Sequence, residues 1–177
     1  IFNKTNYITM NKPSFKPGDN IRFQQIYNEE KEIIENPFIK EFIYALPYVT
    51  AILNKERKII LSNNVSIDPN REITVEEFFG HNTGSMLNCI HANKENGTCD
   101  NDGICKYCGV PNAIFLSEKS NKKEDQETSL SINLNGKIKT FDINVTAAPF
   151  HFKNKRYTLL TIVDISESNR KRALERI

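Results

Sequence analysis

Apolar residues recur at helical spacing near the beginning of the chain. They predict one helix over residues 21–35 and a second, shorter helix over 38–46. Pro37 stands between the two and either breaks or restarts the helix. The second helix places three apolar side chains on one face: Phe38, Phe42 and Leu46.

Patterns typical of β-strands follow in two groups. The first group predicts a hairpin, with strands over 48–54 and 58–64. The second predicts three strands joined by short polar turns, over 128–135, 139–152 and 157–165. Helical spacing returns at Ser166. The order helix, two strands, short helices, three strands and exit helix predicts an α+β fold on a five-stranded antiparallel sheet.

The region between the two groups of strands has little periodicity. Thr74 and Glu77 stand at the spacing of a capping box, which predicts a short helix through Phe79. A further helix is expected over 112–120, and the charged stretch 121–127 is expected to be a solvated loop.

Composition restricts the partners of this chain. Its 177 residues are 38% hydrophobic and 26% charged, with a net charge of +2. A charge so nearly balanced gives no concentrated positive field for nucleic acid or anionic membrane. Apolar runs are short and no leader opens the chain, so we expect a cytoplasmic protein without a membrane segment. Both ends look like cuts, so we expect a fragment of a longer protein.

All four cysteines fall within twenty residues: Cys89, Cys99, Cys105 and Cys108. Two cysteines separated by two residues can place both sulfurs on one metal ion. Gly109 after them permits a positive φ, which would turn backbone N–H groups toward the thiolates. The sequence therefore predicts a four-cysteine site, with His91 as the reserve ligand.

Other interpretations of the cysteines stay open. Two disulfides are disfavoured in an intracellular protein, and redox-active or merely free thiols are the further alternatives. Zinc would staple a long irregular insert, whereas an iron–sulfur cluster would make the domain responsive to its surroundings. The spacing alone decides little between the two.

Two stretches and the cysteine spacing resemble PAS sensor domains. Residues 45–64 resemble the first PAS hairpin, with Pro47 before the strand and an Asn-x-x-Arg-x-Ile pattern across the turn. Residues 163–177 resemble the PAS exit, where a motif of the Asp-Ile-Thr type begins a signalling helix. In this chain the motif is Asp164, Ile165 and Ser166.

The cysteine spacing is similar to that of a PAS subgroup in bacterial sensor histidine kinases. That subgroup carries Cys-x-His, then Cys, then Cys-x-x-Cys-Gly, as this chain does from Cys89 to Gly109. The chain departs from the pattern at Asp100, where the subgroup has a glycine. Haem on His91 and flavin beside Asn88-Cys89 are not expected, because too few residues agree with those sites.

The resemblance implies a domain organisation and a function. Residues 1–46 would form a lead-in with helices, 47–166 the PAS domain with its cysteine-rich insert at 89–109, and 167–177 the start of the signalling helix. The domain would sense redox state, oxygen or nitric oxide in a two-component system and regulate a histidine kinase, without being an enzyme itself. We favour the iron–sulfur cluster over zinc only because a sensor needs something to sense. It would form a homodimer through its N- and C-terminal helices, and Asp164 would tie the exit helix, with Ser166 as N-cap, to the sheet. The alternative is a zinc-stapled dimerisation module without sensing chemistry.

Overall fold

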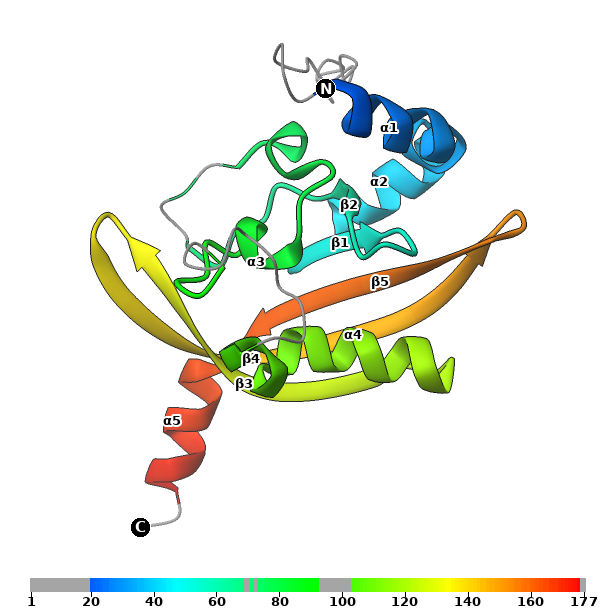
Figure 1. The fold of residues 1–177 in the computed structure, drawn as a ribbon. Coiled ribbons are helices and arrows are strands. Elements are labelled where there is room, and N and C mark those ends of the chain that lie inside the picture. Colours follow the sequence, from blue (N-terminus) through cyan, green and yellow to red (C-terminus); the bar gives the residue numbers. More distant parts are fainter. Residues whose placement is uncertain (1–19, 69–70, 72, 93–102, 176–177) are drawn as a thin grey trace, which may run out of the picture.

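The computed structural model describes residues 20–68, 71, 73–92 and 103–175 (Figure 1). Its strands form one five-stranded sheet in the order β2-β1-β5-β4-β3, in which every neighbouring pair is antiparallel. The α+β class and the antiparallel five-stranded sheet are therefore confirmed. The strands are β1 (Val49–Leu53), β2 (Ile59–Ser62), β3 (Glu124–Leu134), β4 (Lys137–Phe152) and β5 (Lys155–Asp164).

Helices precede, interrupt and follow the sheet. They are α1 (Asn20–Ile34), α2 (Pro37–Ala45), α3 (Thr83–Met86), α4 (Gly109–Ser120) and α5 (Ser166–Leu174), with short 3₁₀ turns η1 (Val75–Phe78) and η2 (Gly103–Tyr107). Within the described ranges, no helix combines the length and the apolar character that a bilayer crossing requires. Of the expected lead-in with helices over 1–46, residues 1–19 lie outside the described residues.

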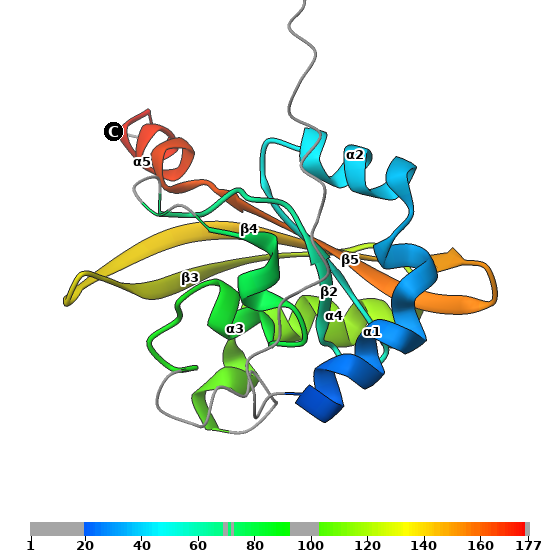
Figure 2. The same ribbon diagram turned by 90° about the horizontal axis from the view of Figure 1, so that it is seen from above.

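Helices pack on both faces of the sheet, as Figure 1 and Figure 2 show, although the face opposite α4 stays exposed along β3. On one face α3 and α4 pack on alternate residues of the strands, among them Ala51, Ile143 and Leu160. On the other face α1 and α2 pack on residues of the opposite phase, including Ile52 and Ile60. Burial on both sides explains why the first hairpin is so rich in apolar residues.

Helix α2 is oriented differently from the expectation. Asn36 caps it by accepting a hydrogen bond from the Ile39 backbone N–H at 3.0 Å, and Pro37 is its first residue. Pro37 therefore restarts the helix. The buried residue of α2 is Ile43, whereas the side chains of Phe38 and Phe42 are 77% and 52% exposed.

Strand β3 is longer than the sequence pattern predicts. It begins at Glu124, so most of the loop expected over 121–127 is strand, and that expectation was wrong. The cause is the length of β4, which pairs with β3 without interruption from Glu124↔Ala147 to Leu134↔Lys137. The pairing partner, rather than hydrophobicity, makes the polar start of β3 a strand.

The capping box expected at Thr74 and Glu77 is absent. Thr74 precedes η1 but makes no side-chain capping hydrogen bond. Glu77 instead pairs with Arg71 at 2.6 Å. The segment forms one 3₁₀ turn that begins after Thr74, as the spacing predicts. The reciprocal capping hydrogen bonds that the sequence also predicts do not form.

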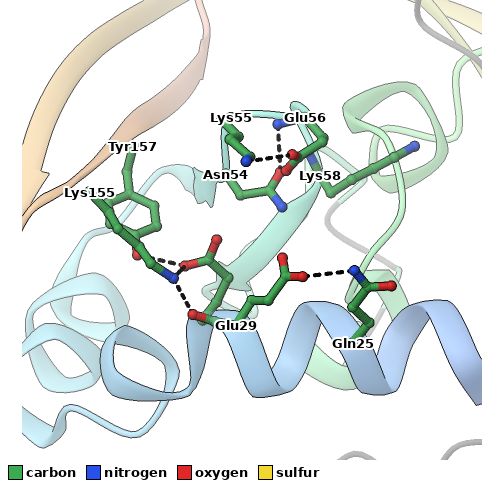
Figure 3. Close-up of polar contacts among 9 residues, drawn as sticks. Gln25, Glu29, Asn54, Lys55, Glu56, Lys58, Lys155 and Tyr157 are labelled. Carbon is green, nitrogen blue, oxygen red and sulfur yellow. Dashed lines mark hydrogen bonds and ion pairs between the residues drawn. The ribbon is translucent and has the colours of Figure 1, made fainter.

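The turn between β1 and β2 is ordered by Asn54, as Figure 3 shows. Its side chain accepts hydrogen bonds from the backbone N–H groups of Glu56 (3.1 Å) and Lys58 (2.9 Å). Arg57 at the turn has a φ of 58° and pairs with Glu118 of α4 at 2.7 Å. The Asn-x-x-Arg pattern thus ties the first hairpin to α4.

A buried carboxylate fastens α1 to the sheet. Glu30 is only 6% exposed, and its Oε2 accepts hydrogen bonds from the Tyr157 hydroxyl at 2.6 Å and from Lys155 Nζ at 3.1 Å. Figure 3 shows Tyr157 and Lys155 pointing from β5 toward α1. Burial and the neighbouring Glu30 raise the pKa of Tyr157, so its hydroxyl stays a donor.

Replacement of Tyr157 by Phe should lower the free energy of unfolding by about 1–3 kcal/mol, because Glu30 loses one of its two side-chain donors while staying buried. Chemical denaturation measures the change. Tyr27→Phe is the matched control, since its hydroxyl bonds to Glu35, a half-exposed carboxylate, and should cost less than about 1 kcal/mol. Equal losses in the two variants would contradict a special role for the Glu30 contact.

Candidate functional site

Cys89 is held at the edge of the sheet. The segment just after α3 pairs with β3 through a bridge between Cys89 and Ile132. The Ile90 N–H donates to the Ser131 carbonyl at 3.1 Å, and Asn88 exchanges bonds with Asn133. Because β3 is an edge strand, residues 88–90 can bond along its outer edge through this isolated bridge, which places the buried Cys89 beside it.

Cys105 and Cys108 stand at the beginning of α4. Cys105 lies in η2 and is buried, while Cys108 is the half-buried N-cap residue of α4. The Cys108 N–H donates to the Cys105 carbonyl at 3.0 Å, which closes a tight turn. The Cys-x-x-Cys pair is thus fixed on the face of the sheet that α4 covers.

Gly109 serves a purpose other than the expected one. It is the first residue of α4 and does not have a positive φ. A Cβ at this position would lie 2.8 Å from Thr128 Cβ and 2.9 Å from its Cγ2, closer than atoms can pack. The Gly109 N–H also points to Thr128 Oγ1, at 3.3 Å. Glycine is required because α4 begins directly against β3.

The thiol of Cys108 is affected by its burial and by the two other described cysteines. Burial raises the pKa of Cys108, and the charges of Cys89 and Cys105 raise it further, against the opposite effect of the Val110 backbone N–H. Thiols from two separate segments therefore lie near enough to Cys108 for their charges to disfavour its thiolate. Soft sulfur donors of this kind suit zinc or an iron–sulfur cluster.

The described residues do not complete a ligand set. Among them, no group of three or more Cys, His, Asp or Glu side chains is placed to hold a metal ion. The predicted ligand Cys99 lies outside the described residues, as does the departure at Asp100. The reserve ligand His91 is half-buried, directly after the segment that pairs with β3. The donor chemistry of the described thiols would suit a thiolate-bound group, but Cys89, Cys105 and Cys108 as placed do not form one by themselves.

The predicted signalling residues form a compact junction at the end of β5. Asp164 Oδ1 accepts hydrogen bonds from the Ser166 backbone N–H (2.9 Å) and hydroxyl (2.6 Å). Ile165 is the N-cap residue of α5, so Ser166 is its first helical residue and not its N-cap. The carboxylate of Asp164 takes over the capping role, and it ties the helix start to the strand that precedes it.

Sequence reasoning missed Asp142, which joins this junction to β4. Its carbonyl accepts from the Ile165 N–H at 2.8 Å, and its N–H donates to Ser166 Oγ at 2.9 Å. Its carboxylate accepts from Asn169 Nδ2 at 3.3 Å and from Ser129 Oγ at 3.1 Å. No local pattern marks Asp142, because its role depends on the register between strands far apart in the sequence.

Comparisons with known proteins reach only solved structures. No family model and no curated protein matches the chain. The PAS domain of Bordetella pertussis BvgS is 12% identical with a TM-score of 0.46, and the match covers 78% of this chain and 93% of that one. A PAS domain from a two-component sensor histidine kinase is 8% identical with a TM-score of 0.46, covering 77% and 98%.

An RNA-binding light-oxygen-voltage receptor is 10% identical with a TM-score of 0.48, and the match covers 92% of this chain and 39% of that one. These values are too low to transfer a ligand, a partner or an activity. The fold class accordingly rests on the strand order and pairing of the chain itself.

The three described thiols should differ in reactivity. In metal-free protein, Cys108 should be alkylated before Cys89 and Cys105, because it is half-buried and the other two are buried. Mass spectrometry of peptides after brief treatment with iodoacetamide measures the order. Full denaturation is the control and should make the rates similar; earlier labelling of Cys89 in the native protein would contradict this arrangement.

Proposed function

We propose that this chain is a PAS-type sensory domain that binds an iron–sulfur cluster or a metal ion through four cysteines: Cys89, Cys99, Cys105 and Cys108. The observation that supports this is that Cys89 and Cys108, from two separate segments, pack on the same core cluster beneath α3 and α4, with Cys89 bridged to β3 and Cys108 at the start of α4. The last strand of the same sheet leads directly into α5. The response would pass through α5 to an output domain, a histidine kinase of a two-component system.

The protein would position the donors through its backbone. Residues 88–90 hold Cys89 along β3, and Gly109, the residue after Cys108, lies against Thr128 at the start of α4. A cluster, when bound, would make the site responsive to oxygen, nitric oxide or redox state. A change at the site would then alter the contacts of residues 88–90 and of the start of α4 with β3. Such a local change can affect a distant part of a protein.

A second function stays in view because the same contacts would suit a purely structural role. Cys89 lies near the beginning of the connection between α3 and α4, and Cys105 and Cys108 lie near its end. A zinc ion bound by these thiols would fasten that connection to the sheet. Exposure of the full-length protein to nitric oxide or an oxidant separates the two functions. A changed output supports sensing, and an unchanged output supports the staple.

Dimerisation through the terminal helices is part of the proposal. Helix α2 exposes Phe38 and Phe42, and Leu174 of α5 is 72% exposed. The exposed phenylalanines border an apolar groove of about 450 Å³ between α2 and the β4–β5 hairpin. Apolar side chains at both ends of the domain suit contact with a second copy in the cytoplasm.

Cys105→Ser should reduce bound metal on the order of tenfold or more, because one of four thiolates is lost. Protein purified with and without oxygen is analysed for colour, iron, sulfide and zinc. His91→Ala is the matched control and should keep the metal if four cysteines complete the set. A colourless protein with zinc in both preparations would contradict the cluster, and full metal content in Cys105→Ser would contradict the ligand set.

Phe38→Glu should weaken self-association by roughly 30-fold, as for a central interface residue. Light scattering on a sizing column over a range of concentrations measures the dimer. Phe115→Glu on α4 is the control, because Phe115 is 40% exposed and lies on the other face of the sheet. Equal dimer content in wild type and Phe38→Glu would rule out α2 as the interface.

A further inference from the structure

We infer that Thr128, Ser129 and Asp142 form the mechanical route from the cysteine site to α5. The inference rests on the proposed function for the nature of the signal, but its three contacts belong to the described structure. None of these residues was marked by the sequence.

The first contact lies between the cysteine site and β3. Thr128 stands directly against Gly109, at a separation that leaves no room for a single Cβ. If Cys108 moved toward the sheet, Gly109 would therefore push directly against Thr128. Cys89 grips the same strand four residues further on, through its bridge to Ile132. Both parts of the site consequently act on one stretch of β3.

The second contact crosses the sheet. Thr128 and Ser129 are neighbours in a strand, so their side chains point to opposite faces. Thr128 meets α4 on one face, while Ser129 Oγ donates to Asp142 Oδ1 at 3.1 Å on the other. Ser129 and Asp142 are also directly opposite in the β3–β4 register. A shift of the strand at Thr128 therefore moves the partner of Asp142.

The third contact holds the exit helix. Asp142 engages Ile165, Ser166 and Asn169, that is, the N-cap and the first turn of α5. No residue within Ser166–Leu174 is buried, and Figure 1 shows α5 projecting from the sheet. Apolar packing thus contributes little to the position of the helix. The attachment of α5 depends on polar contacts at its beginning. Asp164 of β5 makes some of these contacts, and Asp142 of β4 makes most of the others.

The neighbouring pair of side chains offers an internal comparison. Ser131 and Thr140 form a cross-strand hydroxyl contact of 2.8 Å on the same face of the same two strands. Unlike Asp142, Thr140 has no described hydrogen bond to α5. The route therefore predicts that loss of the Ser129–Asp142 contact affects α5, whereas loss of the Ser131–Thr140 contact does not. A general loosening of the sheet would not produce this difference.

The experiment perturbs the site without any metal and follows α5 in the full 177-residue chain. Gly109→Ala presses on Thr128, and Thr128→Val removes the hydroxyl with little change of shape. Hydrogen exchange of the amides of residues 169–174 is measured by mass spectrometry. Both variants should exchange several-fold faster in α5 than wild type, roughly fivefold to tenfold for the loss of about one hydrogen bond.

Ser129→Ala in each background tests the route itself. It should abolish the additional effect of Gly109→Ala or Thr128→Val on α5, whereas Ser131→Ala should leave that effect in place. Unchanged α5 exchange in both single variants would overturn the inference, as would an additional effect that survives Ser129→Ala. Thr128→Val keeps the test valid should Gly109→Ala fail to fold.

Metal analysis of the same variants separates this inference from the proposed function. Ser129→Ala should bind iron or zinc as wild type does, because the serine lies on the face of β3 away from the cysteines. Coupling between Thr128 and α5 in a chain that binds no metal would retain the route and overturn the proposed ligand. Metal binding without that coupling would overturn the route and retain the ligand.

Discussion

Strand β1 is buried along its whole length, and this burial on both faces dominates the architecture. Ala51 faces the core beneath α4, and the adjacent Ile52 faces the core beneath α1 and α2. A strand buried on both sides requires helices on both sides, so the N-terminal helices are part of the core and not an accessory to it. The charged contact at Glu30 then fixes where α1 sits on the outer face.

The edge strand β3 and the exit helix α5 lie where this burial ends. Strand β3 is at the edge of the sheet, and its outer edge is open to the segment that carries Cys89. Helix α5 follows β5 without any buried residue of its own. The site and the exit helix are thus both attached to the sheet by a few specific contacts, and such contacts change more readily than a packed core does.

Much of this organisation could be predicted from the sequence. The hairpin of β1 and β2, the three later strands and the helical ends have strong periodic signals, so their existence and type follow from local pattern. The polar start of β3 has no such signal, because residues from Glu124 onward become a strand only through pairing with β4.

The candidate site shows the same division. Cysteine spacing indicates Cys105 and Cys108 together, and in the described residues Cys89 and Cys108 pack on the same core cluster, although no three ligand side chains there are placed to hold a metal ion. The sequence could not show why residue 109 is glycine, because a positive φ and a close approach of two segments both require glycine. Asp142 is one of 22 acidic residues, and only the register of β4 beside β3 and α5 distinguishes it.

The isolated bridge of residues 88–90 to β3 affects how the protein behaves in solution. It covers the backbone groups of β3 near Ile132, which would otherwise offer an unpaired edge to other chains. Natural sheets shield such edges because open ones promote aggregation. Whatever holds Cys89 in place therefore also protects the protein from intermolecular strand pairing, so a chain that loses this segment from β3 becomes prone to association through that edge.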